Sequence, residues 1–221
     1  RILATAHGSD LAVLPKTPAR PLLKFALGGI DCLAVVSAPM AQTAREIGYK
    51  GRIEVSPMGV DTAIFSAADS SSSRAGVLFA ARLVRGKGAH LLLEAFAKAV
   101  KNHAQTRLVV VGEGEERCAL QEQAECLGVG DKVEFKGFVS QETLASLMSR
   151  ADIFVNPTLA DEGFGLANIE AMACGCLALV SDYPAVHAVI KHGANGFLFP
   201  QGDAGALASL LAGVLDKSRE L

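Results

Sequence analysis

The sequence predicts an α/β protein with a doubly wound parallel sheet and part of a second domain of the same kind. From residue 76 onward, short apolar runs alternate with segments of helical pattern. These runs are apolar throughout, which is typical of parallel strands that helices cover on both faces. Residues 1–60 hold only three further strand-like runs, which are few for an independent sheet of this class.

The elements of the larger part follow from the same alternation. The predicted strands are residues 76–83, 106–113, 132–138, 152–158, 176–182 and 196–200. The predicted helices are residues 87–103, 115–127, 141–150, 166–174, 184–192 and 203–217. Right-handed helical crossovers join such strands into one doubly wound domain, which we place at residues 76–221.

Residues 1–60 are predicted to be the end of an amino-terminal domain. Strand-like runs cover residues 1–7, 31–37 and 51–59, with a helix at 39–48. The sequence opens without methionine inside an apolar run, so we expect the start of this domain to be absent. Residues 61–75 are predicted to link the two parts, because residues 66–75 are polar and serine-rich.

Composition limits the classes of partner. The chain has 221 residues, of which half are apolar, and 21 Lys and Arg balance 23 Asp and Glu. No bulk charge draws it to nucleic acid or to an anionic membrane, so a phosphate site must be local. No apolar stretch reaches the roughly 20 residues of a transmembrane helix, and we expect a cytoplasmic protein.

The five cysteines are interpreted as reduced thiols, since an odd number in a chain of this size does not suggest a disulfide framework. Cys174 and Cys176, with His187 and His192, could form a zinc site. Gly175 between the two cysteines is typical of a helix-to-strand turn, and cysteine is a common buried residue. We therefore expect no metal.

Three cations follow the first apolar run of the larger domain. Their place matters because ligands of open parallel sheets bind beyond the carboxyl ends of the strands. Arg82, Arg85 and Lys87 lie within six positions. The planar fork of Arg and the compact charge of Lys together suit a diphosphate. Cations at a helix start oppose the helix dipole, which favours a binding role for Arg82 and Lys87. Arg85 is explained equally well as a surface charge.

A glycine turn follows the second run. Gly112 and Gly114 would bring backbone amides close to a ligand, although a plain strand-to-helix turn explains them equally well. The stretch lacks the full G-x-G-x-x-G pattern and follows the second strand of the domain instead of the first. A nicotinamide site is therefore disfavoured.

Two acids flank a predicted helix start after the fourth run. Glu162 lies in the loop and Glu170 one turn into the helix, with Gly163 and Gly165 between them. A helix start exposes unpaired amides that can hold a phosphate or a sugar hydroxyl. Glu170 can accept hydrogen bonds from a diol such as ribose, and Glu162 from a sugar. The alternative for Glu170 is a carboxylate that merely favours the helix start.

Four motifs in order resemble a known family. Glu162 to Glu170 matches an E-x7-E motif, "ARLVRGKGAHLLLEAF" resembles GRL-x-x-x-KG, "VVVGEG" resembles the glycine turn that follows, and "PMGVDTAIF" resembles the interdomain segment. The chain looks like a retaining glycosyltransferase of the GT-B type, with two Rossmann-like domains, from family 4, the glycosyl transferases group 1. Ala81 departs from the usual glycine, which leaves the charge pattern intact.

The resemblance implies a UDP- or GDP-sugar donor bound to residues 76–221 and transferred with retention to a saccharide, lipid or small-molecule acceptor. It implies that Arg82 and Lys87 hold the diphosphate and that Glu170 binds the ribose. Glu162, with the amides near Phe164 to Leu166, would orient the sugar. The loop at 137–143, with Val139, would contact the base. His7 matches a histidine that faces donor and acceptor.

The resemblance implies no metal and no separate cofactor, since no D-x-D motif is present and two cations would replace the ion. Membrane docking, if any, is expected in the absent amino-terminal part, at the inner face of the membrane. Because acceptor recognition is expected there too, catalysis by this chain alone is doubtful. Two alternatives stay open: a nucleotide-binding module without chemistry, and a nucleotide-sugar epimerase.

Overall fold

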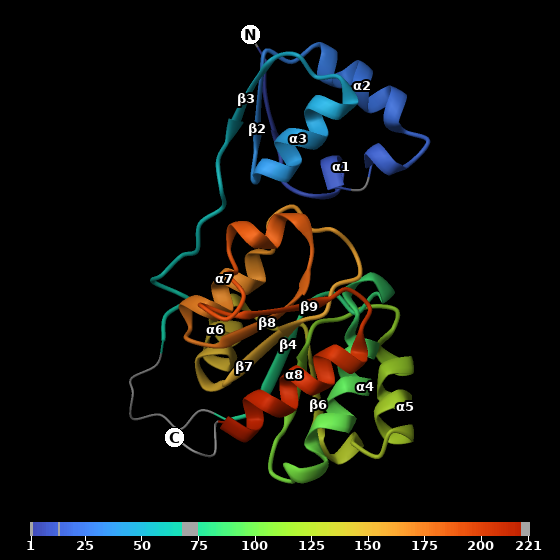
Figure 1. Ribbon diagram of the computed structural model, residues 1–221, viewed down its shortest axis with the longest axis vertical. Helices are drawn as coiled ribbons and strands as arrows, with labels where there is room; N and C mark the ends of the chain where they lie inside the picture. The colour runs from blue at the N-terminus through green and yellow to red at the C-terminus, as the bar shows by residue number, and fades with distance from the viewer. Residues whose placement is uncertain (1, 13, 68–74, 218–221) are drawn as a thin grey trace. The chain divides into compact units, whose positions relative to one another are not determined.

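The computed structural model describes residues 2–12, 14–67 and 75–217 of the chain (Figure 1). Most of the predicted serine-rich linker, residues 68–74, lies outside the described residues. Contacts divide the chain into two compact units. The first comprises Arg1–Gly59, Asp161–Leu166 and Tyr183–Val189, and the second Val60–Ala160, Ala167–Asp182 and Ile190–Leu221. Both contain parallel sheets, which confirms the predicted α/β class.

The second unit contains a six-stranded parallel sheet. Its strands are β4 (Val77–Ala80), β5 (Leu108–Val111), β6 (Val133–Gly137), β7 (Ile153–Asn156), β8 (Leu177–Asp182) and β9 (Phe197–Pro200). Their order is β6-β5-β4-β7-β8-β9. The order changes direction between β4 and β7, and open sheets of this kind bind ligands at that switch point, beyond the carboxyl ends of the strands.

Helices cover both faces of this sheet (Figure 1). One face packs against α4 (Ala89–Ala99), α5 (Arg117–Cys126) and α8 (Ala204–Lys217), and the other against α6 (Gln141–Arg150) and α7 (Leu166–Ala173). Successive strand residues point to opposite faces. In β4, Val77 and Phe79 accordingly enter the first core and Leu78 the second. This double burial explains why the strands read as unbroken apolar runs.

The first unit contains a three-stranded parallel sheet of β1 (Leu3–Ala6), β2 (Cys32–Val35) and β3 (Arg52–Val55). Around it lie α1 (Ser9–Ala12), a 3-10 turn at Leu14–Lys16, α2 (Arg20–Gly28) and α3 (Ala38–Ile47). Helices α2 and α3 lie on the same side of the sheet (Figure 1). Leu33 and Val35 of β2 are buried, whereas Leu3 of β1 is 67% exposed.

Helix ends follow local residue chemistry. Helix α3 ends at Gly48, whose φ of 104° is left-handed and closes the helix through backbone bonds to Ala44 and Arg45. Helix α6 begins at Ser140, whose hydroxyl accepts a 3.3 Å hydrogen bond from the Thr143 amide. Both ends coincide with the predicted boundaries within one residue.

One predicted helix is wrong. Residues 184–192 form only a 3-10 turn, Pro184–Ala188, followed by irregular backbone. His192 is held by β9, since its Nδ1 accepts a 3.0 Å hydrogen bond from the Leu198 amide and its ring meets Phe197 edge-on. This tertiary contact draws the end of the segment into a bridge with Gly196 and prevents helical continuation.

Two further differences concern helix positions. The helix predicted at 87–103 is shorter in the structure and corresponds to α4. Gly88 takes a left-handed φ of 71° before it, and residues 100–102 form a 3-10 turn after it. Helix α2 was not predicted at all. Arg20 and Lys24 recur four positions apart on one flank, but apolar residues are found both on its buried side, at Leu27, and on its exposed side, at Phe25, so they do not mark a single buried face.

Candidate functional site

The loops that follow β4, β5, β6 and β7 form one continuous edge in the second unit. Three backbone hydrogen bonds of 2.8 Å join them in turn: Gly112 N to Gly137 O, Leu83 N to Glu113 O, and Leu159 N to Gly86 O. The bonds connect β5 with β6, β4 with β5, and β4 with β7. The structure therefore brings the predicted cationic loop beside the loop that leads from β7 toward α7.

Gly112 and Gly114 allow this close approach. A Cβ atom at Gly112 would overlap the Ala81 carbonyl, and one at Gly114 would overlap the Leu83 carbonyl. Gly112 also has a φ of 129°, which favours glycine. Backbone packing between the β4 and β5 loops thus accounts for both glycines, and a direct contact with a ligand stays a prediction.

The three cations of the β4 loop differ in their surroundings. Arg82 is exposed at the end of β4, and Lys87 is half-buried in the 3-10 turn Arg85–Lys87. Arg85 is 70% exposed and its Nη1 lies 3.9 Å from Glu116 Oε2. This ion pair at the start of α5 agrees with the surface-charge interpretation of Arg85. Arg82 and Lys87 remain the candidates for an anionic ligand.

Glu170 lies in α7 and is half-buried. Burial raises the pKa of its carboxyl above the ordinary value of 4.5, because desolvation disfavours the charged form. Such a carboxylate has lost part of its hydration. Hydrogen bonds from hydroxyl donors would therefore stabilise its charged form. This environment suits the predicted contact with a diol.

A buried amide pair that sequence reasoning missed connects α7 to the sheet. Asn156 Nδ2 at the end of β7 donates a 3.0 Å hydrogen bond to Asn168 Oδ1 in the first turns of α7, and Asn168 is fully buried. The pair ties the helix that carries Glu170 to β7. Its only sequence signal is an asparagine that ends an apolar run and a second one inside an apolar helix start.

The other half of the E-x7-E motif belongs to the first unit. Glu162 is half-buried, and Gly163 and Phe164 are buried. A Cβ atom at Gly163 would overlap the His7 carbonyl, so the structure brings the His7 main chain against this loop. The His7 side chain itself is exposed. Gly165 takes a φ of 80° immediately before α7 begins at Leu166, a conformation that favours glycine.

The turn around His7 is fixed by a carboxylate. Asp10 Oδ1 accepts a 2.8 Å hydrogen bond from the Gly8 amide, and Asp10 Oδ2 accepts one of 3.1 Å from the His7 amide. This satisfies the first amides of the "HGSD" turn and orients the end of β1.

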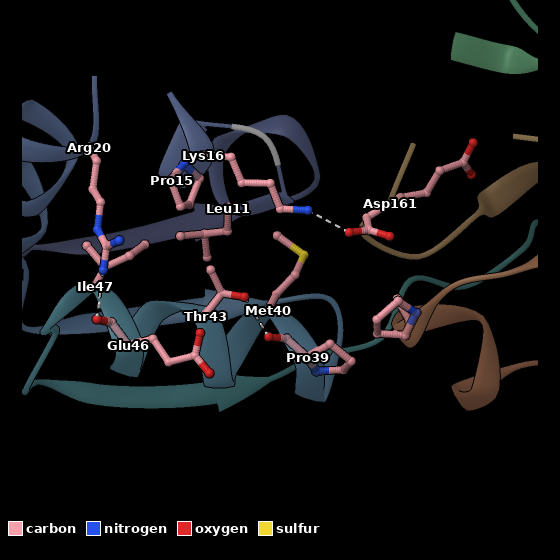
Figure 2. Close-up of a pocket in the computed structure, with 13 residues that line it drawn as sticks. Leu11, Pro15, Lys16, Arg20, Pro39, Met40, Thr43, Glu46, Ile47 and Asp161 are labelled. Carbon is pink, nitrogen blue, oxygen red and sulfur yellow. Dashed lines mark hydrogen bonds and ion pairs between the residues drawn. The ribbon is translucent and has the colours of Figure 1, made fainter. Parts of the chain in front are cut away.

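A pocket of about 250 Å³ lies in the first unit, and Glu162 is one of its lining residues. Figure 2 shows Lys16 reaching across to Asp161, with 2.7 Å between Nζ and Oδ2. Met40, Ile47 and Leu11 supply apolar walls, and Thr43 and Glu46 supply polar groups. The mixed lining suits a ligand with both apolar and hydroxyl-bearing parts.

The predicted site residues fall into two sets. Arg82, Lys87, Gly112, Gly114, Val139 and Glu170 belong to the second unit, and His7, Glu162, Gly163, Phe164, Gly165 and Leu166 to the first. Val139 is half-buried just beyond β6, next to Phe138, which is 86% exposed. In the second unit, Arg82, Lys87, Gly112 and Gly114 lie on loops that backbone hydrogen bonds join, and Glu170 lies in α7.

The buried cysteines belong to the core of the second unit. Cys176 Sγ lies 2.9 Å from the Met148 carbonyl and Cys174 Sγ lies 3.8 Å from the Ala145 carbonyl, both in α6. Within the described ranges, no group of three or more His, Cys, Asp or Glu is placed to hold a metal ion. No helix in the described part of the chain is long and apolar enough to span a membrane.

Comparisons with known proteins agree with the motif pattern. Phosphatidyl-myo-inositol mannosyltransferase of Mycolicibacterium smegmatis is 38% identical over 165 residues, covering 72% of this chain and 42% of that protein. N-acetyl-alpha-D-glucosaminyl L-malate synthase of Bacillus anthracis is 28% identical over 220 residues, covering 94% of this chain and 56% of that protein. The chain thus spans about half the length of these curated relatives.

Solved structures show the same fold. The structure of Anabaena Alr3699/HepE in complex with UDP-glucose aligns with a TM-score of 0.86 at 22% identity, covering 100% of this chain and 64% of that one. Residues 61–221 match the family model described as Glycosyl transferases group 1, which is well over half of the chain. On this match and the curated relatives, the chain belongs to the glycosyl transferases group 1 family.

Proposed function

We propose that this chain is mainly the donor-binding part of a glycosyltransferase. The enzyme transfers a sugar from a UDP- or GDP-sugar to an acceptor with retention of anomeric configuration. The observation that carries the proposal is the joined edge of the β4–β7 loops, where two cations and the loop toward the E-x7-E helix meet. Family membership supports the reaction class, and the UDP-glucose complex of the HepE protein supports the donor class.

Arg82 and Lys87 bind the diphosphate in this proposal. When the bond between the anomeric carbon and the phosphate oxygen breaks, negative charge develops on the leaving nucleotide. A guanidinium fork and an ammonium close to that oxygen stabilise this charge. The proposal assigns to these two side chains the role that a metal ion has in other sugar transferases, and it requires no further cofactor.

The carboxylates bind the sugar rings. Glu170 accepts hydrogen bonds from the ribose hydroxyls, which compensate for the hydration that burial removes from its carboxyl. Glu162 and the amides of Phe164 to Leu166 orient the transferred sugar, and His7 assists there. Val139 and its loop contact the base, and Gly112 and Gly114 lie at the edge of that base-binding loop.

The pocket of the first unit contributes part of the acceptor site in this proposal, and the expected amino-terminal part supplies the rest. That pocket combines apolar walls with the Lys16–Asp161 ion pair and the Glu162 side chain. Its mixed lining would admit a saccharide, a lipid headgroup or a small metabolite. The proposal places the enzyme in the cytoplasm, in contact with the inner face of a membrane.

Calorimetric titration of this chain with UDP, GDP and ADP, and with their sugars, tests donor binding. We expect one nucleoside diphosphate to bind and to raise the unfolding temperature. Lys87→Ala and Arg82→Ala should each weaken that binding by about tenfold or more, since hydrogen bonds between charged groups contribute about 1.5–3 kcal/mol. Lys98→Ala, an exposed cation in the last turn of α4, is the control and should bind normally.

Binding that is unaffected by Arg82→Ala and Lys87→Ala would refute the proposal. Turnover separates the remaining alternatives when the product is analysed by NMR. Nucleotide binding without turnover of any donor supports a module that lacks chemistry. A donor returned with altered configuration at C2 indicates an epimerase. A transferred sugar that keeps its anomeric configuration supports the retaining transferase.

A further inference from the structure

The side chain of Thr158, in the loop that follows β7, is fully buried. Its Oγ1 lies 3.3 Å from the Gly86 carbonyl oxygen and 3.2 Å from the Ala160 carbonyl oxygen, and it accepts a 3.3 Å hydrogen bond from the Ala160 amide. A hydroxyl has one proton to donate, so Thr158 shares it between the two carbonyls. The hydroxyl therefore bridges the β7 loop and the β4 loop.

Gly86 is the middle residue of the 3-10 turn Arg85–Lys87. Its carbonyl oxygen also accepts a 2.8 Å hydrogen bond from the Leu159 amide. A carbonyl oxygen has two lone pairs and can accept two donors at once. One donor leaves the carbonyl free to turn about the hydrogen bond, whereas two donors fix the direction in which it points. Leu159 and Thr158 together thus fix the orientation of the peptide group between Gly86 and Lys87.

The turn itself gives this peptide group little support. A Cβ atom at Gly86 would meet no atom of the described residues within 4 Å, so that side of the residue is open. Glycine also has the widest choice of backbone angles, and the hydrogen bonds of a 3-10 turn have poor geometry. The amides of Lys87 and Gly88 donate such bonds, of 2.9 and 3.1 Å, to the carbonyls of Val84 and Arg85. We therefore expect the hydrogen bonds from the β7 loop to decide where the turn lies.

Lys87 depends on this peptide group for its direction. It follows Gly86 directly, so the orientation of the shared peptide group sets the direction in which the Lys87 side chain leaves the backbone. Lys87 is one of the two cations proposed to bind the diphosphate. A displacement of about 1 Å in a reacting or binding group can lower a rate by about a hundredfold. The function of this ammonium is therefore sensitive to the Thr158 hydroxyl.

We propose that Thr158 is a positioning residue for Lys87. Its hydroxyl fixes the peptide group between Gly86 and Lys87, and so directs the Lys87 ammonium toward the diphosphate of the donor. The inference rests on the proposed function for the identity of the ligand, whereas the order of the turn is a property of the chain itself. The alternative is a hydroxyl that serves only the Ala160 amide within its own loop. Variants distinguish the two roles because only the first reaches Lys87.

Calorimetric titration with UDP and GDP tests the effect on the ligand. Thr158→Val keeps the branched shape of the side chain and removes its hydroxyl. It should weaken binding of the preferred nucleoside diphosphate by about threefold to tenfold, the usual contribution of one hydrogen bond. Thr158→Ser keeps the hydroxyl and should restore the affinity to within about twofold of the wild type. Binding of the parent nucleoside, uridine or guanosine, should be equal in all three proteins by NMR titration, because it has no phosphate for Lys87.

A thermodynamic cycle shows whether Thr158 acts through Lys87. In the Lys87→Ala background, Thr158→Val should leave the affinity for the nucleoside diphosphate unchanged, since the side chain that it positions is gone. The same fold loss in both backgrounds would overturn the inference. Thr106→Val is the matched control, because Thr106 lies just before β5 on the amino-terminal side of the sheet. This variant should bind the nucleoside diphosphate like the wild type.

Amide hydrogen exchange gives a readout that needs no ligand. The Lys87 and Gly88 amides are hydrogen-bonded within the turn, and their exchange reports its local opening. Thr158→Val should accelerate exchange at both amides by about threefold to tenfold. The acceleration should exceed any change at the Phe96 amide in α4, which reports global stability. Equal changes at the turn and at Phe96 would indicate a purely structural hydroxyl and would overturn the inference.

The two readouts separate this inference from the proposed function. A wild type that binds no nucleotide would refute the proposed function, and exchange at Lys87 and Gly88 would still decide the inference. Nucleotide binding that is equal in the wild type and Thr158→Val would overturn the inference and leave the proposed function standing. Thr158→Ala also lacks the hydroxyl and places no methyl beside the carbonyls. It replaces Thr158→Val in these experiments if circular dichroism shows the valine variant unfolded.

Discussion

The two units are built from the same kind of parallel strand but differ in how their sheets are covered. In the second unit, helices pack on both faces of six strands, and Phe79, Phe96 and Phe154 are almost fully buried. In the first unit, α2 and α3 share one side of three strands, while Leu3 and Phe25 remain largely exposed. The second unit therefore completes its own hydrophobic core, whereas the first presents apolar surface for contact with something else.

One substitution in each unit tests this contrast in burial, and the one in the second unit should have the largest effect of all. Phe96→Ala, on the buried face of α4, should lower the free energy of unfolding by about 3–5 kcal/mol. Phe25→Ala should change it by less than about 0.5 kcal/mol, because the side chain is already in water. Urea denaturation followed by circular dichroism measures both. A similar loss in the two variants would show that Phe25 is buried in solution and would remove the contrast.

The same contrast explains which elements could be predicted from the sequence. Strands β4 to β9 follow from apolar runs, since burial on both faces leaves each run unbroken. Helix α2 was not predicted, because Leu22 and Phe25 are exposed and its apolar residues therefore do not mark one buried face. The false helix at 184–192 required knowledge of the contact between His192 and β9, which lie in different segments of the chain.

The candidate site divides in a similar way. Arg82 and Lys87 are predicted because residues that follow strands gather at the carboxyl edge of a parallel sheet, and Glu170 because it lies one turn into a helix; their roles stay predictions. The connections between those loops depend on register and on close backbone approach, which the sequence does not show. The Asn156–Asn168 pair is a further case, since it exists only once β7 and α7 have packed together.

Two glycines with nearly equal φ angles allow a comparison between a packed edge and an open turn. Gly88 and Gly128 have φ of 71° and 70°. A Cβ atom at Gly88 would overlap the Pro157 carbonyl, whereas one at Gly128 would meet nothing within 4 Å.

Gly128→Ala should therefore cost only the left-handed backbone strain, about 1–2 kcal/mol. Gly88→Ala should cost about 3 kcal/mol or more, because the collision with backbone also separates the β4 and β7 loops. Urea denaturation gives both values. Gly88→Ala should also weaken the proposed nucleotide binding, and Gly128→Ala should not. Equal losses in the free energy of unfolding would show that the β4–β7 contact accommodates the added Cβ atom without a further loss of stability.

The smallest expected effect compares two glutamates of the second unit whose carboxyl pKa values move in opposite directions. Burial raises the pKa of Glu170, whereas hydrogen bonds from its own amide and from the Ser140 hydroxyl lower the pKa of Glu142. A raised pKa means that stability is full at low pH and is lost as pH rises through the folded value. A lowered pKa means the reverse: stability is present above the ordinary value and is lost as pH falls through the folded one.

At neutral pH, Glu170→Gln should therefore unfold at a slightly higher temperature than the wild type, and Glu142→Gln at a slightly lower one. The difference for Glu170→Gln should disappear as the pH falls below the ordinary pKa of 4.5, and the difference for Glu142→Gln only as the pH falls through the lowered pKa of the folded state. Thermal unfolding across this pH range measures the two signs. A stabilising Glu170→Gln that also loses nucleotide affinity would show that the carboxylate is retained for its ligand and not for the fold, since a structural carboxylate would show the behaviour of Glu142.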